Sequence, residues 1–188
     1  SDSIPSRSYN LTRTSNVSTP PSYASALPIG SDLLDFRIQS ILGVGGFGIT
    51  YLAQDLLLQK NVAIKEYYPS GQVMRAVDGS VTVNASHVAE EYRAGLDRFL
   101  QEARTLAGFT HPNIVRVNRF FTANGTGYMV MDYEEGRSLK QLVEQRSAAL
   151  SEDEIRQIMA PLLEGIEKVH DAGFLHRDIK PENVFVRD

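Results

Sequence analysis

The chain has 188 residues, of which 42% are hydrophobic, and a formal net charge of −4. This length suits one ordinary domain with or without a flexible extension, and the apolar content excludes disorder throughout. The negative charge argues against sequence-independent binding of nucleic acid, which needs clustered basic surface. The chain has no apolar run of about 18 residues that would predict a membrane-spanning helix. It also has no Cys, which excludes a disulfide framework and leads us to expect a cytoplasmic protein.

Residues 1–32 are predicted to be a disordered tail. Through residue 28 they are rich in Ser, Thr and Pro and carry few large apolar groups. Such a segment cannot bury enough surface to offset the entropy lost on ordering. Its hydroxyls could be phosphorylation sites, but a plain linker is the favoured interpretation. Order is expected to begin near Leu33.

Five strands and one helix are predicted next. Alternating and β-branched residues indicate strands at 36–42, 49–53, 61–68, 114–121 and 128–133. Asp78-Gly79 lies between two Val-bearing runs and predicts a hairpin over 73–83, and Asn124-Gly125 predicts a turn. Residues 89–107 carry apolar side chains at helical spacing.

Residues 135–188 are predicted to form a helical part of the fold. Ser138 and Ser151 each open a capping box at the start of a helix. The second of these helices is expected to end at Gly173 and to be kinked at Pro161. Strands followed by helices indicate an α+β fold. The chain begins with Ser and stops soon after a chemically rich loop, so we expect a piece of a longer protein.

The first candidate site is the glycine cluster Gly43-Val44-Gly45-Gly46-Phe47-Gly48. Glycines at this G-x-G-x-x-G spacing let backbone N–H groups approach phosphate oxygens. Dinucleotide-binding folds use the same spacing where a strand enters a helix. Here predicted strands flank the cluster on both sides, which favours a hairpin over phosphates. A glycine-rich hairpin without a ligand remains the alternative.

A second candidate is a Lys and a Glu brought together by two predicted elements. Lys65 ends the apolar run Val62-Ala63-Ile64 and could simply be solvated. Glu102 shares a face of the predicted helix with Phe99 and Leu106. A carboxylate beside a packing face needs a partner, because an unpaired buried charge is costly. We therefore predict that Lys65 pairs with Glu102 and can reach the phosphates of a nucleotide.

The stretch from His176 to Asn183 carries the strongest chemical pattern. Asp178 can accept a proton from an attacking hydroxyl or orient it, and Lys180 can neutralise charge on a transferred phosphoryl group. Asn183 offers an amide oxygen, a ligand type that Mg²⁺ prefers. Together these residues indicate phosphoryl transfer rather than a polar surface loop.

In type and order, these motifs resemble those of the protein kinase family over residues 34–188. Lys180-Pro181-Glu182 is similar to the Ser/Thr-specific form. The closely spaced glycine cluster, the Lys-Glu-Tyr-Tyr-Pro run and the long insert before the helix look like bacterial members. The resemblance implies an α+β, protein-kinase-like fold. Residues 33–134 would form the N-lobe, a five-stranded antiparallel sheet with one helix, and the hinge. Residues 135–188 would form the start of a helical C-lobe that is truncated before the Asp-Phe-Gly segment.

The resemblance further implies ATP and Mg²⁺ as cofactors and a protein with a Ser or Thr hydroxyl as substrate. Asp178 would be the catalytic base, assisted by Lys180, Lys65 and Glu102, and Asn183 would bind Mg²⁺. The nucleotide would be bound by Leu42, Gly43, Val44, Gly45, Gly46, Phe47, Gly48, Thr50, Ala63, Lys65, Met131, Asp132, Tyr133, Glu134 and Phe185.

Within that set, the resemblance implies particular roles around the adenine ring. Met131 would be the gatekeeper, and the backbone of residues 132–134 would form the hinge that binds the ring. Ala63 would cover the ring from above and Phe185 from below. Thr50 stands where the family usually has Val, so adenine stacking there is expected to weaken slightly.

The insert and the end of the chain lead to further expectations. We predict that the hairpin at 73–83 tunes the Lys65–Glu102 pair; a decorative insert is the alternative. Because no Asp-Phe-Gly segment follows Asn183, the chain by itself is expected to be inactive or poorly active. Apolar surface left uncovered is expected to favour self-association. The competing function is a natively short binding or interaction module, but such a module has no chemical need for the three polar residues of the loop.

Overall fold

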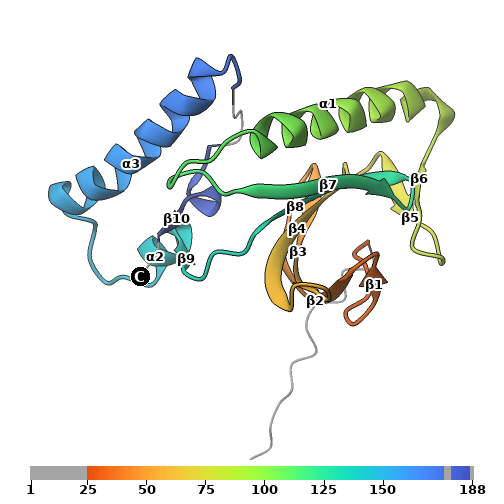
Figure 1. Cartoon of the computed structure of the whole chain (residues 1–188), viewed down its shortest axis with the longest axis horizontal. Helices are drawn as coiled ribbons and strands as arrows, with labels where there is room; N and C mark the ends of the chain where they lie inside the picture. Colours follow the sequence, from red (N-terminus) through yellow and green to blue (C-terminus); the bar gives the residue numbers. More distant parts are fainter. Residues whose placement is uncertain (1–24, 176–178, 187–188) are drawn as a thin grey trace, which may run out of the picture.

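The structure is a computed structural model that describes residues 25–175 and 179–186. A curled antiparallel sheet carries one long helix across it, and a smaller part with two further helices and a short sheet follows (Figure 1). The strands are β1 (Asp32–Leu33), β2 (Phe36–Val44), β3 (Gly48–Asp55), β4 (Lys60–Tyr67), β5 (Val73–Arg75), β6 (Val81–Val83), β7 (Val117–Ala123), β8 (Thr126–Asp132), β9 (Arg137–Ser138) and β10 (Phe185–Val186). The helices are α1 (Ala89–Ala107), α2 (Leu139–Glu144) and α3 (Glu152–Asp171), with 3-10 turns at Ser86–Val88 and Pro181–Asn183.

The main sheet has the strand order β1-β2-β3-β4-β8-β7, and every neighbouring pair is antiparallel. All of the predicted sheet strands are present, but β1 is an additional edge strand, so the predicted number of five is wrong by one. β1 is too short to produce an alternating pattern. It pairs Asp32 with Arg37, whose side chains also form an ion pair of 2.8 Å.

Strands β5 and β6 form the predicted hairpin, separate from the main sheet. Gly79 has a φ of 85°, which only glycine adopts without strain, and this allows the tight turn after Asp78. The N–H of Val81 donates to the carbonyl of Asn124 at 2.7 Å. The hairpin therefore lies against the β7–β8 turn, next to the start of α1 (Figure 1).

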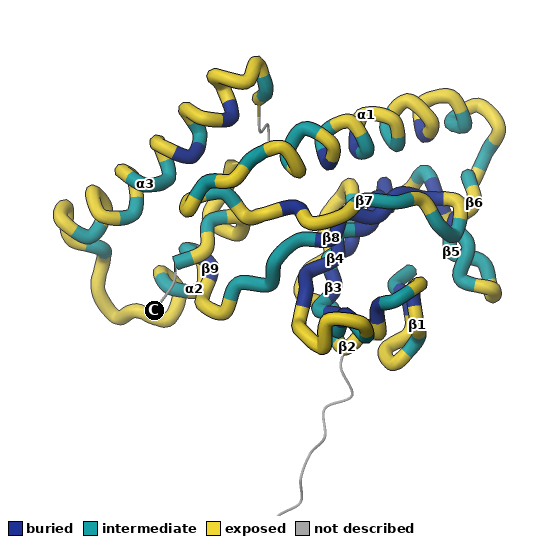
Figure 2. Tube along the Cα trace, viewed as in Figure 1, coloured by how far each residue is buried: buried dark blue, intermediate teal, exposed yellow. Residues whose placement is uncertain are grey.

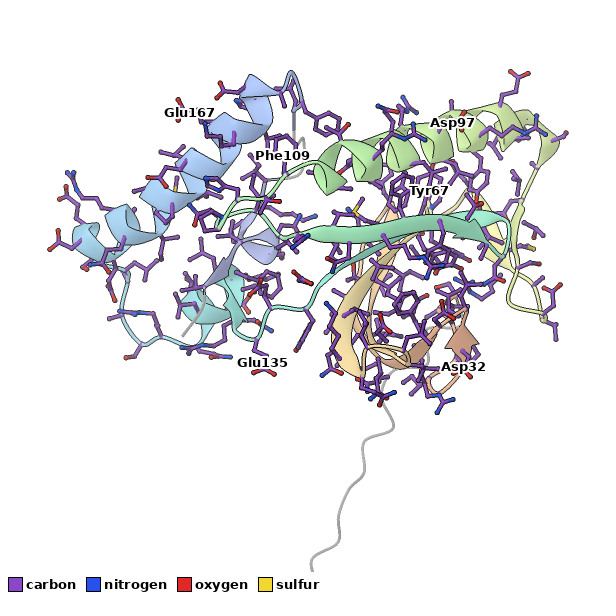
Figure 3. All side chains as sticks on the ribbon, in the orientation of Figure 1. Asp32, Tyr67, Asp97, Phe109, Glu135 and Glu167 are labelled. Atoms are coloured by element: carbon purple, nitrogen blue, oxygen red, sulfur yellow. The ribbon has the colours of Figure 1, made fainter. Side chains whose placement is uncertain are left out.

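Helix α1 occupies the predicted range and packs closely on the sheet. Two glycines allow this close approach. A Cβ at Gly127 would lie 2.8 Å from Leu96, and a Cβ at Gly95 would collide with the hydroxyl of Tyr67. The ring of Tyr67 lies between the sheet and the helix (Figure 3), with its centroid 5.7 Å from that of Phe99.

Helices α2 and α3 begin at the predicted capping boxes. The side chains of Ser138 and Ser151 each accept a hydrogen bond from the backbone N–H three residues on. In return, the side chains of Gln141 and Glu154 accept from the backbone N–H groups of the two serines. After α3, Gly173 has a φ of 74°, as expected for a helix end. Within the two described ranges, no helix is long and apolar enough to cross a membrane.

The core lies inside the curled sheet, where burial is concentrated (Figure 2), and it includes Leu27. Leu27 is 7% exposed, and its N–H donates to the hydroxyl of Tyr51 at 3.0 Å. The prediction that the tail extends through residue 32 is therefore wrong for residues 25–32. A single apolar side chain in a Ser- and Pro-rich segment gives no periodic signal. Residues 1–24 lie outside the described residues.

Substitution of Leu27 tests whether the segment before β1 belongs to the folded domain. Leu27→Ala should lower the free energy of unfolding by about 2 kcal/mol or more, because it removes buried methyl groups and leaves a cavity. Leu57→Ala is the matched control, since Leu57 is 75% exposed in a turn. Urea unfolding followed by circular dichroism measures both. Equal, small losses in the two variants would show that this segment does not contribute to the core.

Candidate functional site

The sheet register places the predicted nucleotide-binding residues of β3, β4 and β8 on one face. Thr50 pairs with Lys65, and Leu52 pairs with Ala63, across β3 and β4. Ala63 also pairs with Met131 across β4 and β8. Directly opposed residues in antiparallel strands project from the same face, and so do residues two apart on one strand. Thr50, Ala63, Lys65 and Met131 therefore form one continuous surface.

The glycine cluster spans the end of β2, the turn at residues 45–47 and the start of β3 at Gly48, at the edge of this surface. The carbonyl of Gly46 accepts from the N–H of Ser70 at 2.8 Å, and the carbonyl of Phe47 accepts from the N–H of Tyr68 at 3.1 Å. In a planar trans peptide the C=O and the following N–H point in opposite directions. The N–H groups of Phe47 and Gly48 therefore point away from the Tyr68–Ser70 segment and into the turn. Such N–H groups can bind phosphate oxygens.

Lys65 extends toward the same turn. A Cβ built at Gly48 would lie 3.9 Å from the Cε atom of Lys65. The side chain of Lys65 thus runs beside Gly48, at the end of the turn. An ammonium beside several N–H donors makes a site for an anion with more than one oxygen.

The predicted pair between Lys65 and Glu102 is not formed in this structure. Among the ion pairs made by residues 25–175 and 179–186, none joins these two side chains. Glu102 does lie on α1, near the buried side chains of Phe99 and Ala103, and it is itself half-buried. Sharing a helix face with apolar residues fixes the direction of a side chain, but not its distance from a strand.

A different buried carboxylate, Glu66, holds the sheet together from its other face. Glu66 is fully buried. Its Oε1 accepts from the hydroxyl of Tyr128 at 2.8 Å, its Oε2 accepts from the hydroxyl of Tyr51 at 2.7 Å, and it pairs with Arg75 of β5 at 2.6 Å. Sequence reasoning missed this group. The signal was available, because Glu66 falls two residues after Ile64 on the apolar face of β4, where a charge requires partners.

The surroundings of Glu66 hold its partners in one protonation state. Burial lowers the pKa of Arg75, but the adjacent carboxylate outweighs this effect and the pKa is raised. Burial, and then the charge of Glu66, raise the pKa of both Tyr51 and Tyr128. Arg75 therefore stays charged, and both hydroxyls stay protonated donors, at any physiological pH.

The hinge residues follow the sheet directly. Asp132 ends β8, and its N–H donates to the carbonyl of Arg116 at 3.0 Å. Its carboxylate accepts from the amide of Asn118 at 2.7 Å and lies 3.5 Å from the ammonium of Lys60. Residues 133–136, which include the rest of the predicted hinge, then connect the sheet to β9 and α2. The chain is thus anchored up to Asp132 at the point where it leaves the sheet.

The predicted catalytic loop is attached to α2. Lys180 and Asn183 lie in the described part of the chain, whereas Asp178 lies outside the described residues. The N–H of Asn183 donates to the carbonyl of Lys180 at 2.9 Å and closes the 3-10 turn. Glu182, in that turn, pairs with Lys140 of α2 at 3.1 Å. The loop is therefore anchored to the helix that follows the hinge.

The remaining predicted site residues lie on strands and turns, of which β9 and β10 were not predicted and β2 extends two residues further than predicted. Phe185 is on β10, opposite Ser138 of β9. Leu42, Gly43 and Val44 are on β2; Gly45, Gly46 and Phe47 are in the turn; Tyr133 and Glu134 follow β8. No cluster of three or more His, Cys, Asp or Glu side chains that could hold a metal is found among the described residues. The assignment of Asn183 as a ligand of Mg²⁺ therefore stays a prediction from the sequence.

This arrangement agrees with comparisons with known proteins. The family model of the protein kinase domain matches residues 36–188, and the chain belongs to the protein kinase family. Within it, the chain is of the bacterial serine/threonine type. It is 32% identical over 152 residues to serine/threonine-protein kinase pkn2 of Myxococcus xanthus, covering 80% of this chain and 16% of that one. It is 30% identical to the probable serine/threonine-protein kinase YbdM of Bacillus subtilis (strain 168), covering 81% and 53%.

A solved structure extends the agreement to the fold. The apo form of PpkA-294 superposes with a TM-score of 0.81 and 40% sequence identity, covering 87% of this chain and 58% of that chain. The chain thus spans between 16% and 58% of these three proteins. The kinase α+β fold predicted from the sequence is confirmed, and the comparisons do not favour a binding module without catalysis.

Two glycines of the turn should differ in what they tolerate. A Cβ at Gly48 would lie 2.5 Å from the carbonyl oxygen of Glu66, whereas a Cβ at Gly46 would meet nothing within 4 Å. Gly48→Ala should therefore lower the free energy of unfolding by about 1–3 kcal/mol through overpacking of β3 on β4. Gly46→Ala is the control and should stay within about 0.5 kcal/mol. Thermal unfolding of both variants measures this, and equal stabilities would contradict the close packing at Gly48.

Proposed function

We propose that this domain binds Mg²⁺·ATP against the face of β3, β4 and β8 and transfers the γ-phosphoryl group to a Ser or Thr hydroxyl of a protein. The observation that carries the proposal is the register that aligns Thr50, Lys65, Ala63 and Met131 on one surface. The glycine turn lies at the edge of that surface, and the N–H groups of Phe47 and Gly48 point into the turn. A nucleotide is the ligand that needs both a flat apolar surface for its ring and donors for its phosphates.

The adenine ring would lie nearest the hinge. Ala63 offers a small apolar surface above it, and Met131 lies opposite Ala63 at the back. Phe185, from β10, would close the ring from below. The backbone of residues 132–134 would supply the hydrogen bonds that distinguish adenine. Leu42 and Val44 are exposed on β2, at the open side of the surface.

The phosphates would then extend toward the turn. The N–H groups of Phe47 and Gly48 and the ammonium of Lys65 would bind their oxygens. Mg²⁺, with Asn183 as one ligand, would supply positive charge beside the phosphates when bound. A solved relative supports an adenine nucleotide as ligand: the structure of Rad53 1-466 in complex with AMP-PNP is 26% identical to this chain with a TM-score of 0.62.

The transfer step assigns roles to the catalytic loop. The oxygen of a substrate Ser or Thr attacks the γ-phosphorus, the bond from the γ-phosphorus to the bridging oxygen breaks, and ADP leaves. Asp178 orients the hydroxyl and takes its proton. Lys180 would neutralise charge on the transferred group. Each of these groups acts on atoms that change charge during the reaction.

The 188 residues by themselves are proposed to transfer phosphate poorly. They contain no Asp-Phe-Gly sequence, whose Asp holds the second side of the metal site in this family.

The 188 residues also expose Ile155, Met159 and Leu163, spaced by four residues along α3. This stripe supports the prediction of self-association, because side chains at such spacing share one helix face.

Nucleotide binding can be tested through stability. Saturating Mg²⁺·ATP should raise the melting temperature by several degrees, because a ligand that binds the folded state alone stabilises it. Lys65→Ala should abolish most of this rise, since it removes the charge facing the phosphates. Lys168→Ala, an exposed Lys on α3, is the matched control and should keep the rise. A full rise in the Lys65 variant would contradict the role of Lys65.

Phosphoryl transfer can be tested through the loop. In the full-length protein, Asp178→Asn should lower transfer to a protein substrate by about 100-fold or more, because the amide cannot accept the hydroxyl proton. Asp153→Asn, in the first turn of α3, is the matched control. Transfer of ³²P from labelled ATP to a generic Ser/Thr substrate measures both. Equal rates in the two variants would remove Asp178 from the mechanism.

A further inference from the structure

Arg75 of the hairpin uses all three of its guanidinium nitrogens. Nη2 bonds Glu66 of β4 at 2.6 Å, Nη1 donates to the carbonyl of Gly79 at 2.9 Å, and Nε donates to the carbonyl of Ser25 at 2.6 Å. The Arg75 and Glu66 side chains are 5% and 0% exposed. One side chain therefore fastens the hairpin turn, strand β4 and the segment before β1 to each other.

The same guanidinium contacts the segment that holds the glycine turn. Its central carbon lies 5.2 Å from the centroid of the Tyr68 ring, a cation–π distance. The N–H of Tyr68 donates to the carbonyl of Phe47, and the N–H of Ser70 donates to the carbonyl of Gly46. We call residues 68–70 the tether. Contacts thus run without a gap from Arg75 through the tether to the glycine turn.

We propose that Arg75 is a positioning residue for the phosphate-binding turn: by clamping the hairpin to Glu66 and packing on Tyr68, it keeps the tether bonded to Gly46 and Phe47. The tether fixes the direction of these two carbonyls, and so the direction of the N–H groups of Phe47 and Gly48 that face the phosphates. This inference rests on the proposed function. It also gives the insert a role other than tuning the Lys65–Glu102 pair, which is not formed here.

The geometry requires an arginine. Three acceptors surround the side chain in different directions, and the planar guanidinium reaches all of them at once. A lysine at this position would carry the charge to Glu66 but would have one nitrogen for the three acceptors. A lysine variant therefore separates the charge from the positioning.

The test compares nucleotides with and without phosphates in the full-length protein. The main variant is E66Q/R75M, which removes both buried charges and keeps apolar volume, so that it folds even where R75M alone leaves Glu66 unpaired. Isothermal titration with Mg²⁺·ATP and with adenosine gives the two affinities. We expect the Kd for ATP to rise about tenfold, which corresponds to about 1.4 kcal/mol, and the Kd for adenosine to stay within about twofold.

Two further variants complete the series. R75K should give an ATP affinity between those of the wild type and the double variant. R119M is the matched control: Arg119 is a half-exposed arginine on β7 that pairs with Asp35, and its loss should change neither affinity. Hydrogen exchange provides a readout without nucleotide, because the amides of Tyr68 and Ser70, which donate to the carbonyls of Phe47 and Gly46, should exchange faster in E66Q/R75M than in the wild type.

The outcomes are distinguishable. Weakening of ATP and adenosine by the same factor, or an unchanged ATP affinity, would overturn the positioning role while leaving the proposed function intact. A folded wild type that binds neither ligand would overturn the proposed function. In that case, faster exchange of the Tyr68 and Ser70 amides in E66Q/R75M would still support the role of Arg75 in holding the turn, and unchanged exchange would overturn it.

Discussion

The arrangement of the sheet depends on one carboxylate that has no contact with solvent. Glu66 accepts hydrogen bonds from Tyr51 of β3 and Tyr128 of β8 and pairs with Arg75 of β5. Removing a charge from water costs several kcal/mol, and removing one partner of such a pair typically costs about 3–5 kcal/mol more. The group is therefore a poor source of net stability but a strict condition on geometry: every competing arrangement that separates these side chains leaves a buried charge unpaired.

That condition extends to the functional surface, because β4 has two faces. Ala63 and Lys65 project to one face and Ile64 and Glu66 to the other. A shift of one residue in the pairing of β4 would exchange the faces, placing Lys65 in the apolar interior and Glu66 at the surface proposed to bind the nucleotide. The hydrogen bonds of Glu66 to both neighbouring strands exclude this shift. The buried acid thus fixes the register that places Lys65 under the glycine turn.

Features that depend on residues close together in the sequence were predictable. Features that depend on the distance between side chains of different elements were not. The capping boxes at Ser138 and Ser151, and the Asp78-Gly79 turn, each depend on residues within a few positions, and all are found. The family assignment rests on motif order, which is also written along the chain. The pairing of Lys65 with Glu102, by contrast, required the distance between a strand and a helix. The two-residue β1 and the burial of Leu27 have too few residues to form a pattern.

The contacts of Arg75 also change where the functional unit begins. The family model matches from residue 36, yet Ser25 accepts a hydrogen bond from Arg75, and Leu27 packs in the core and donates to Tyr51. Tyr51 and Arg75 both bind the same oxygen of Glu66. Displacing the segment before β1 would therefore remove the Leu27 N–H from Tyr51 and the Ser25 carbonyl from Arg75, and both of these side chains hold Glu66. Arg75 also packs on the tether. If Arg75 positions the glycine turn as proposed, displacement of the segment before β1 would also affect that turn, through the partners that they share.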